Sequence, residues 1–155
     1  MAVEWLNEAL RLAQQAADED EVPVGAVIVW KDPAQGALKI VGRGYNRREQ
    51  DDNPIAHAEI IAIQDAARTT GHWRLMDCVM YVTLEPCPMC LAACQQARLE
   101  AVYYGVSDPK GGALSLGYPL HQDTRINHRF KVEPCEPSNS ECGAILKRFF
   151  QRKRD

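Results

Sequence analysis

The chain is 155 residues long, with 46% hydrophobic and 25% charged residues, a net charge of −3 and an isoelectric point near 5.8. Its length and composition indicate one globular domain, residues 1–155, which can bury roughly two-thirds of its unfolded surface. The small net charge gives no overall case for nucleic-acid binding. No apolar stretch approaches the ~20 residues that a membrane span requires, so no membrane association is expected.

Apolar residues recur with helical period near the start of the chain, which predicts an amphipathic helix. Residues 24–30 form a continuous apolar run that is typical of a strand covered on both faces. A turn over residues 31–36 leads into a second strand over about 38–45. The periodic positions of the helix are Leu6, Ala9, Leu10, Ala13, Ala16 and Ala17.

A second helix is predicted to begin near His57, after an entry turn at Asn53-Pro54, and to end before Gly71. A third strand over residues 78–84 leads directly into Pro86 and a further helix.

The last third of the chain predicts two more strands and a closing helix. Residues 102–106 form a fourth strand, residues 107–117 a loop rich in glycine, and residues 130–132 a short fifth strand. Residues 141–154 form the helix, with an apolar stripe of Ile145, Leu146, Phe149 and Phe150. Strands that alternate with helices predict an α/β layered sheet.

Two short motifs carry metal-binding chemistry. The first is His57-Ala58-Glu59, and the second runs from Pro86 to Cys90, with thiols at Cys87 and Cys90. Together they offer one imidazole and two thiolates, plus a carboxylate that is not needed as a ligand. Catalytic zinc sites use three protein ligands and leave a position for water, whereas structural sites close with four. The motifs therefore predict a catalytic Zn²⁺ site in which Glu59 moves protons on and off the zinc-bound water. The combination of H-x-E with P-C-x-x-C is the signature of zinc-dependent nucleobase deaminases.

The spacing within each motif constrains the local structure. Cys87 and Cys90 are three apart and project from one helix face, where the helix dipole favours thiolates. His57 and Glu59 are two apart, which would place them roughly 200° apart in mid-helix. They can serve one site only if the helix begins at about His57.

Each half of the pattern has a simpler explanation. A lone C-x-x-C in a cytosolic protein can be a redox pair, and a lone His in an Ala/Ile-rich helix is more often a packed core residue. The two halves together favour the metal site. The remaining cysteines are expected to be reduced and structural, because the chain begins without a signal-peptide pattern and the predicted location is cytoplasmic. They are Cys78, Cys94, Cys135 and Cys142.

Charge is uneven along the chain, with an acidic run over residues 18–21 and basic residues at the end. Such a basic end is often only a solvated helix face. Here Phe149 and Phe150 lie within it and offer aromatic faces beside cations that can contact phosphate. The cations are Lys147, Arg148, Arg152, Lys153 and Arg154.

Segments along nearly the whole chain resemble the bacterial tRNA-specific adenosine deaminases of the cytidine-deaminase-like superfamily. The matching segments are residues 21–25, Asn46, 56–60, 83–90, 104–110, 127–129, Glu141-Cys142 and Phe149-Phe150. The resemblance implies a three-layer α/β/α fold with a central mixed five-stranded sheet. It also implies a homodimer that binds a tRNA anticodon loop and converts adenosine to inosine at the wobble position.

The resemblance also implies roles for individual residues. His57, Cys87 and Cys90 hold zinc, and Glu59 transfers protons. Asn46 and the backbone of Ala58 orient the flipped base, and RNA contacts come from Asp108, Lys110, Phe149 and Arg152. Residues 111–116, which include Leu114-Ser115-Leu116, depart from the smaller residues usual in the family.

Three hypotheses follow from the sequence. The first is a tRNA adenosine deaminase. The second is a deaminase of the same fold that acts on a free base or nucleoside, such as guanine or cytosine. The third is a non-catalytic zinc module that binds RNA, against which the unligated Glu59 argues.

Overall fold

The computed structural model describes residues 2–155, and its centre is a five-stranded mixed sheet in the order β2-β1-β3-β4-β5. The strands are β1 (Gly25–Lys31), β2 (Leu38–Tyr45), β3 (Cys78–Leu84), β4 (Ala101–Val106) and β5 (Lys131–Pro134). Strand β1 pairs antiparallel with both β2 and β3, while β4 pairs in parallel with β3 and β5. All five predicted strands are present, and each bound differs from its prediction by two residues or fewer.

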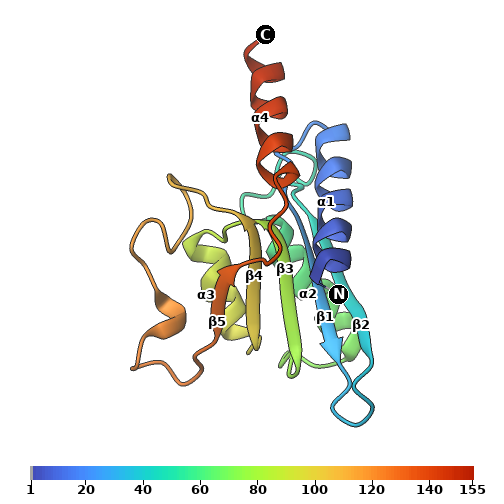
Figure 1. The fold of residues 1–155 in the computed structure, drawn as a ribbon, viewed down its shortest axis with the longest axis vertical. Helices are drawn as coiled ribbons and strands as arrows, with labels where there is room; N and C mark the ends of the chain where they lie inside the picture. Colours follow the sequence, from blue (N-terminus) through green and yellow to red (C-terminus); the bar gives the residue numbers. More distant parts are fainter. Residues whose placement is uncertain (1) are drawn as a thin grey trace.

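Helices cover both faces of this sheet, so the three-layer α/β/α fold is confirmed (Figure 1). The helices α2 (Ala58–Thr70) and α3 (Pro88–Gln96) lie on one face, and α1 (Ala2–Asp18) and α4 (Glu141–Arg154) lie on the other. One 3₁₀ turn, η1 (Leu120–Gln122), interrupts the long connection between β4 and β5 and was not predicted. No helix in residues 2–155 is long and apolar enough to cross a bilayer.

Strand β1 is buried on both faces, as its continuous apolar run predicted. Ala26 and Ile28 belong to the core beneath α2 and α3, while Val27 and Val29 pack with Leu12 of α1. Successive side chains of a strand point to opposite faces, so one apolar run supplies both layers.

Helix α2 lies very close to strand β2. Its inward residues Ala58, Ala62 and Ala66 are fully buried, and a Cβ atom at Gly44 of β2 would stand 2.3 Å from the carbonyl oxygen of Ala58. Small residues on both elements permit this approach, which fixes where the first turn of α2 stands at the end of the sheet.

Candidate active site

The N-termini of α2 and α3 meet at one end of the sheet. His57 is the N-cap of α2 and Cys87 is the N-cap of α3, both with extended backbone. Pro88 occupies the first turn of α3, where the missing N–H costs no hydrogen bond. Because His57 precedes the first helical residue, it is not separated from Glu59 by the roughly 200° around the helix axis that two mid-helix residues at this spacing would have. Both side chains can therefore serve one site. The predicted start of this helix is confirmed.

Three metal-ligating side chains converge between these helix ends. The ligand atoms of His57, Cys87 and Cys90 lie within 4.8 Å of one another. Nδ1 of His57 is 3.6 Å from Sγ of Cys87 and 3.4 Å from Sγ of Cys90. Tetrahedral zinc with bonds of about 2.0 Å to nitrogen and about 2.3 Å to sulfur separates those atoms by about 3.5 Å. The three side chains therefore fit a single zinc ion.

Contacts among these side chains shift their pKa values. The hydrogen bond from the Cys90 thiol, together with the His57 imidazole, lowers the pKa of the Cys87 thiol to about 4 despite its burial. The same hydrogen bond and burial raise the pKa of Cys90, and the hydrogen bond with Cys87 raises the pKa of His57. The sulfurs of Cys87 and Cys90 thus share one proton. A metal cation bound between them in place of that proton would stabilise both residues as thiolates.

Glu59 is buried beside this cluster, in the first turn of α2. Its side chain is 4% exposed, and burial raises the pKa of its carboxyl to about 7. It lines a cavity of about 140 Å³ together with His57 and Cys87. A carboxyl group with a pKa near neutrality can both accept and donate a proton at pH 7, as general acid–base catalysis requires.

Asn46 also lines this cavity and directly follows the last residue of β2. Its Nδ2 donates to the carbonyl of Val22 at 3.2 Å, and its Oδ1 accepts the backbone N–H of Arg48 at 3.2 Å. These bonds orient the amide and leave one N–H and one lone pair for a ligand.

Ala58 and Asp108 also line the cavity. Ala58 is the first residue of α2, where a backbone N–H has no partner within the helix. Oδ1 of Asp108 accepts the backbone N–H groups of Lys110 and Gly111 at 3.3 and 3.1 Å. Lys110 is exposed on the same loop, and within residues 2–155 the lining of this cavity does not include it.

Sequence reasoning missed five residues of the cavity wall, which come from strand ends and from a loop. They are Val22, Val24, Arg48, Leu84 and Glu85. Glu85 had one signal, because a charged residue stands directly between a buried strand and Pro86-Cys87 and so needs partners.

A second cavity of about 550 Å³ adjoins the first and shares Val22, Asn46 and Arg48 with it. Phe149 of α4 lines it but is only 5% exposed, whereas Phe150 is 45% exposed. The guanidinium carbon of Arg152 lies 5.4 Å from the Phe149 ring centre, and its Nη2 donates to the carbonyl of Ala17 at 3.4 Å. Both residues therefore pack against the body of the protein, and Phe149 also lines this cavity.

Two of the basic residues at the end of the chain form ion pairs. Lys153 pairs with Asp20 at 2.6 Å, and Arg148 pairs with Glu141. The basic end of α4 is thus partly neutralised, by the acidic run after α1 and by its own first turn.

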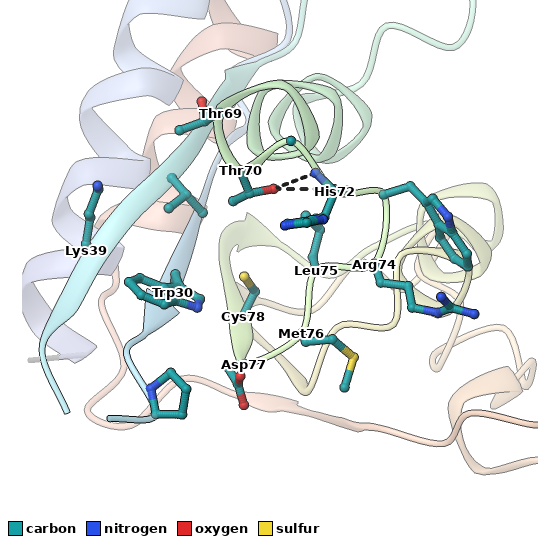
Figure 2. A pocket seen from close by; sticks show the side chains of 14 residues that line it. Trp30, Lys39, Thr69, Thr70, His72, Arg74, Leu75, Met76, Asp77 and Cys78 are labelled. Atoms are coloured by element: carbon teal, nitrogen blue, oxygen red, sulfur yellow. Dashed lines mark hydrogen bonds between the residues drawn. The ribbon is translucent and has the colours of Figure 1, made fainter. Parts of the chain in front are cut away.

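A larger cavity of about 750 Å³ lies at the other end of the sheet, between the end of α2 and the start of β3 (Figure 2). Thr70 and His72 are joined there by hydrogen bonds of 3.3 Å, and Trp30 and Lys39 come from β1 and β2. Glu59 and two of the three metal-ligating residues, His57 and Cys87, line the cavity of about 140 Å³ instead, which makes that cavity the candidate active site.

Comparisons with known proteins agree with this geometry. A family model described as MafB19-like deaminase matches residues 2–154. A tRNA-specific adenosine deaminase from Bacillus subtilis is 40% identical over 150 residues, which are 97% of the chain and 89% of the relative.

Solved structures show the same relationship. One, from work on A-to-I editing by tRNA:A34 deaminases, has a TM-score of 0.81 and 38% identity, covering 93% of the chain and 99% of that structure. A guanine deaminase from Bacillus subtilis has a TM-score of 0.61 and 29% identity, with coverages of 97% and 92%. The chain therefore belongs to the MafB19-like deaminases and to the family of the tRNA-specific adenosine deaminases, which confirms the resemblance seen in the sequence.

Proposed function

We propose that this protein is a zinc-dependent hydrolytic deaminase that converts adenosine to inosine at the wobble position of tRNA anticodons. The observation that carries the proposal is the convergence of His57, Cys87 and Cys90 beside the buried carboxyl of Glu59. Three ligands and a separate acid are the donor set of a catalytic zinc site. The 40% identity to a tRNA-specific adenosine deaminase supports both the reaction and the RNA substrate.

His57, Cys87 and Cys90 would hold the metal. Zn²⁺ bound there would supply Lewis acidity, which makes a water molecule at the open coordination position more acidic.

Glu59 moves the protons of the reaction. It takes one proton from the attacking water and gives it to ring nitrogen N1 while the new C–O bond forms at C6. It then passes the second proton of the water to the exocyclic amine. The C–N bond breaks, ammonia leaves with the bonding electrons, and the ring keeps a carbonyl, which completes inosine. A pKa of about 7 suits a carboxyl that both accepts and donates within one cycle.

The cavity wall orients the base. The remaining N–H and lone pair of Asn46 would hydrogen-bond the purine, together with the free N–H of Ala58 at the start of α2. Bases in a single-stranded loop are splayed out at small cost, so an anticodon loop can deliver one nucleotide into this cavity. Asp108, Lys110, Phe149 and Arg152 would contact the neighbouring nucleotides, for which the adjoining cavity offers space.

We further propose that the chain is one catalytic domain over residues 1–155, acts in the cytoplasm and forms a homodimer. The helices and the loop that carry the site residues pack on one five-stranded sheet, which supports a single domain. A tRNA substrate favours the cytoplasm. The exposed apolar side chains of Trp73 and Met76 offer surface for a second copy, and the family resemblance supports that assembly.

A deaminase of free bases is the second candidate. It is favoured by the resemblance to a guanine deaminase at 29% identity and by the acidic isoelectric point near 5.8.

One experiment separates these candidates. The zinc-loaded protein is incubated with unmodified tRNA, with its anticodon stem–loop, and separately with guanine, cytosine and adenosine, and the nucleosides are analysed by mass spectrometry. Inosine at the wobble position supports the proposal. If a free base or nucleoside is converted and RNA is not, the tRNA proposal is rejected and the protein is a small-molecule deaminase. If no substrate is converted, the non-catalytic zinc module is the hypothesis that remains.

A further inference from the structure

A buried carboxylate that takes no part in the proposed chemistry anchors one wall of the cavity. Glu85 follows the last residue of β3 and is 3% exposed. Its backbone N–H donates to the carbonyl of Val106 at 2.8 Å, which ties it to the end of β4. Cys87 comes two residues later, so the anchor and half of the metal site share one short segment.

The Glu85 carboxylate accepts three hydrogen bonds from the loop over residues 107–117. Oε1 accepts the backbone N–H of Asp108 at 3.0 Å and the hydroxyl of Ser115 at 2.7 Å. Oε2 accepts the backbone N–H of Ser115 at 2.9 Å. All three donors meet carboxylate oxygens, and the ionised carboxylate, which only accepts, is the form that satisfies them.

The loop also packs tightly on this carboxylate. A Cβ atom at Gly112 would stand 2.1 Å from Oε2 of Glu85. The backbone N–H of Ala113 donates to the carbonyl of Pro86 at 2.8 Å, which adds a second tie to the same segment. Ser115 bonds Glu85 through both its backbone N–H and its hydroxyl, so one residue of the loop supplies two of the three hydrogen bonds.

We propose that Glu85 is a positioning residue that holds the 107–117 loop, through Asp108 and Ser115, in the conformation that binds RNA. Asp108 lines the catalytic cavity, and its carboxylate in turn orders the backbone of Lys110. The metal ligands and Glu59 stand on the starts of α2 and α3, outside this loop. Loss of the anchor therefore weakens substrate binding and leaves the chemical step nearly intact. The inference rests on the proposed function for the identity of the substrate.

The test uses two variants and a control in the full-length protein. Glu85→Gln keeps the shape of the side chain but turns an NH₂ group toward N–H donors, so at least one loop hydrogen bond is lost. Ser115→Ala removes the hydroxyl alone and serves in its place if Glu85→Gln does not fold. The control is Glu100→Gln, because Glu100 is exposed and stands immediately before β4.

The first readout needs no substrate. Amide hydrogen exchange at Asp108 and Ser115 should become about tenfold faster in Glu85→Gln and about threefold faster in Ser115→Ala, while exchange in β3 stays unchanged. Unchanged exchange at both amides would overturn the proposal.

The second readout is steady-state kinetics on the anticodon stem–loop. We expect KM to rise about tenfold in Glu85→Gln with kcat within about twofold and zinc content equal to that of the control. The melting temperature should fall by a few degrees, because a buried hydrogen bond is lost. A loss of kcat at constant KM, or no change in either, would overturn the positioning role. If the wild type ignores RNA, the proposed function fails, and the same KM comparison is made on the base or nucleoside that it converts. An unchanged KM there would also overturn the positioning role.

Discussion

Glu59 and Glu85 are both buried at the same cavity, yet their pKa values move in opposite directions. Burial raises the pKa of Glu59 to about 7, whereas hydrogen bonds from the 107–117 loop lower the pKa of Glu85. A carboxyl that titrates near neutrality suits proton transfer, and a carboxylate saturated with donors suits an anchor. The surroundings of each side chain, and not its residue type, assign the two roles.

The proton-transfer role of Glu59 predicts a separation of activity from stability. Glu59→Gln should retain zinc and melt close to the wild type, because Gln has the same shape and no charge to bury. Deamination should fall by a factor of about 10² or more, the usual scale for loss of a general acid–base group. Zinc analysis, thermal melting and kcat measure the three quantities. A variant that keeps most of its turnover would refute the role, and one that loses zinc would make Glu59 a ligand.

The proposed metal ligands predict that substitution of Cys87 lowers the zinc content of the protein, whereas substitution of a cysteine outside the site does not. The purified protein should contain about one zinc per chain, as a single three-ligand site requires. Cys87→Ala should release the metal and lower the melting temperature. Cys135→Ala is the control, because Cys135 is a buried free thiol outside the metal cluster. It should lose some stability through its cavity while keeping zinc. Full zinc retention in Cys87→Ala would contradict the ligand set.

At the scale of the elements, the site depends on how closely α2 approaches the sheet. The start of α2 carries His57 and Glu59, and its buried alanine face rests on β2 at Gly44. A helix–strand contact of this kind transmits a displacement at one residue to the ends of the helix, because packed interiors give way little.

Gly44→Ala should therefore damage both stability and metal binding. Its new Cβ would meet the Ala58 carbonyl at 2.3 Å, and the overpacking should cost about 3 kcal/mol of folding free energy and weaken zinc binding. Gly143→Ala is the matched control. It lies in α4 with its nearest contact at an ordinary 3.6 Å, and should stabilise the protein by up to about 1 kcal/mol through helix propensity. Denaturant unfolding and zinc titration measure both effects, and a Gly44→Ala protein with wild-type values would refute the close packing.

At the scale of the whole molecule, RNA binding depends on where cations remain available on an acidic protein. The net charge is −3, and Lys153 and Arg148 are already paired with acidic residues. Phosphate contacts by the remaining cations supply affinity that falls with salt. Arg152 also touches Phe149 and the end of α1, so its substitution affects packing as well as charge.

The variant Arg152→Ala with Arg154→Ala should bind the anticodon stem–loop more weakly and with a salt slope shallower by about 1.4, the value for two lost phosphate contacts on a single strand. Zinc content should not change, and a small loss of melting temperature is expected from Arg152. The control is Lys31→Ala with Lys39→Ala, which removes the same charge at the other end of the sheet. Equal salt slopes for the two double variants would show that the end of α4 makes no specific RNA contact.

Local patterns in the sequence determined the elements and the reactive groups. Apolar runs bounded by turn residues identified the strands, and apolar residues at helical spacing identified the first and last helices. The two motifs identified the metal ligands and Glu59, because zinc chemistry limits both residue type and number. The start of α2 at His57 followed from requiring one site to serve both residues.

Only the tertiary structure decided the surroundings of those groups. The bonds from Glu85 to Asp108 and Ser115 span 23 and 30 residues, and the pair of Asp20 with Lys153 joins the two ends of the chain. Phe149, expected beside RNA, proved to be largely enclosed. Spacing along the chain reports which side chains share a face of one element. Partners contributed by other elements, and the burial that sets a pKa, exist only after those elements pack together.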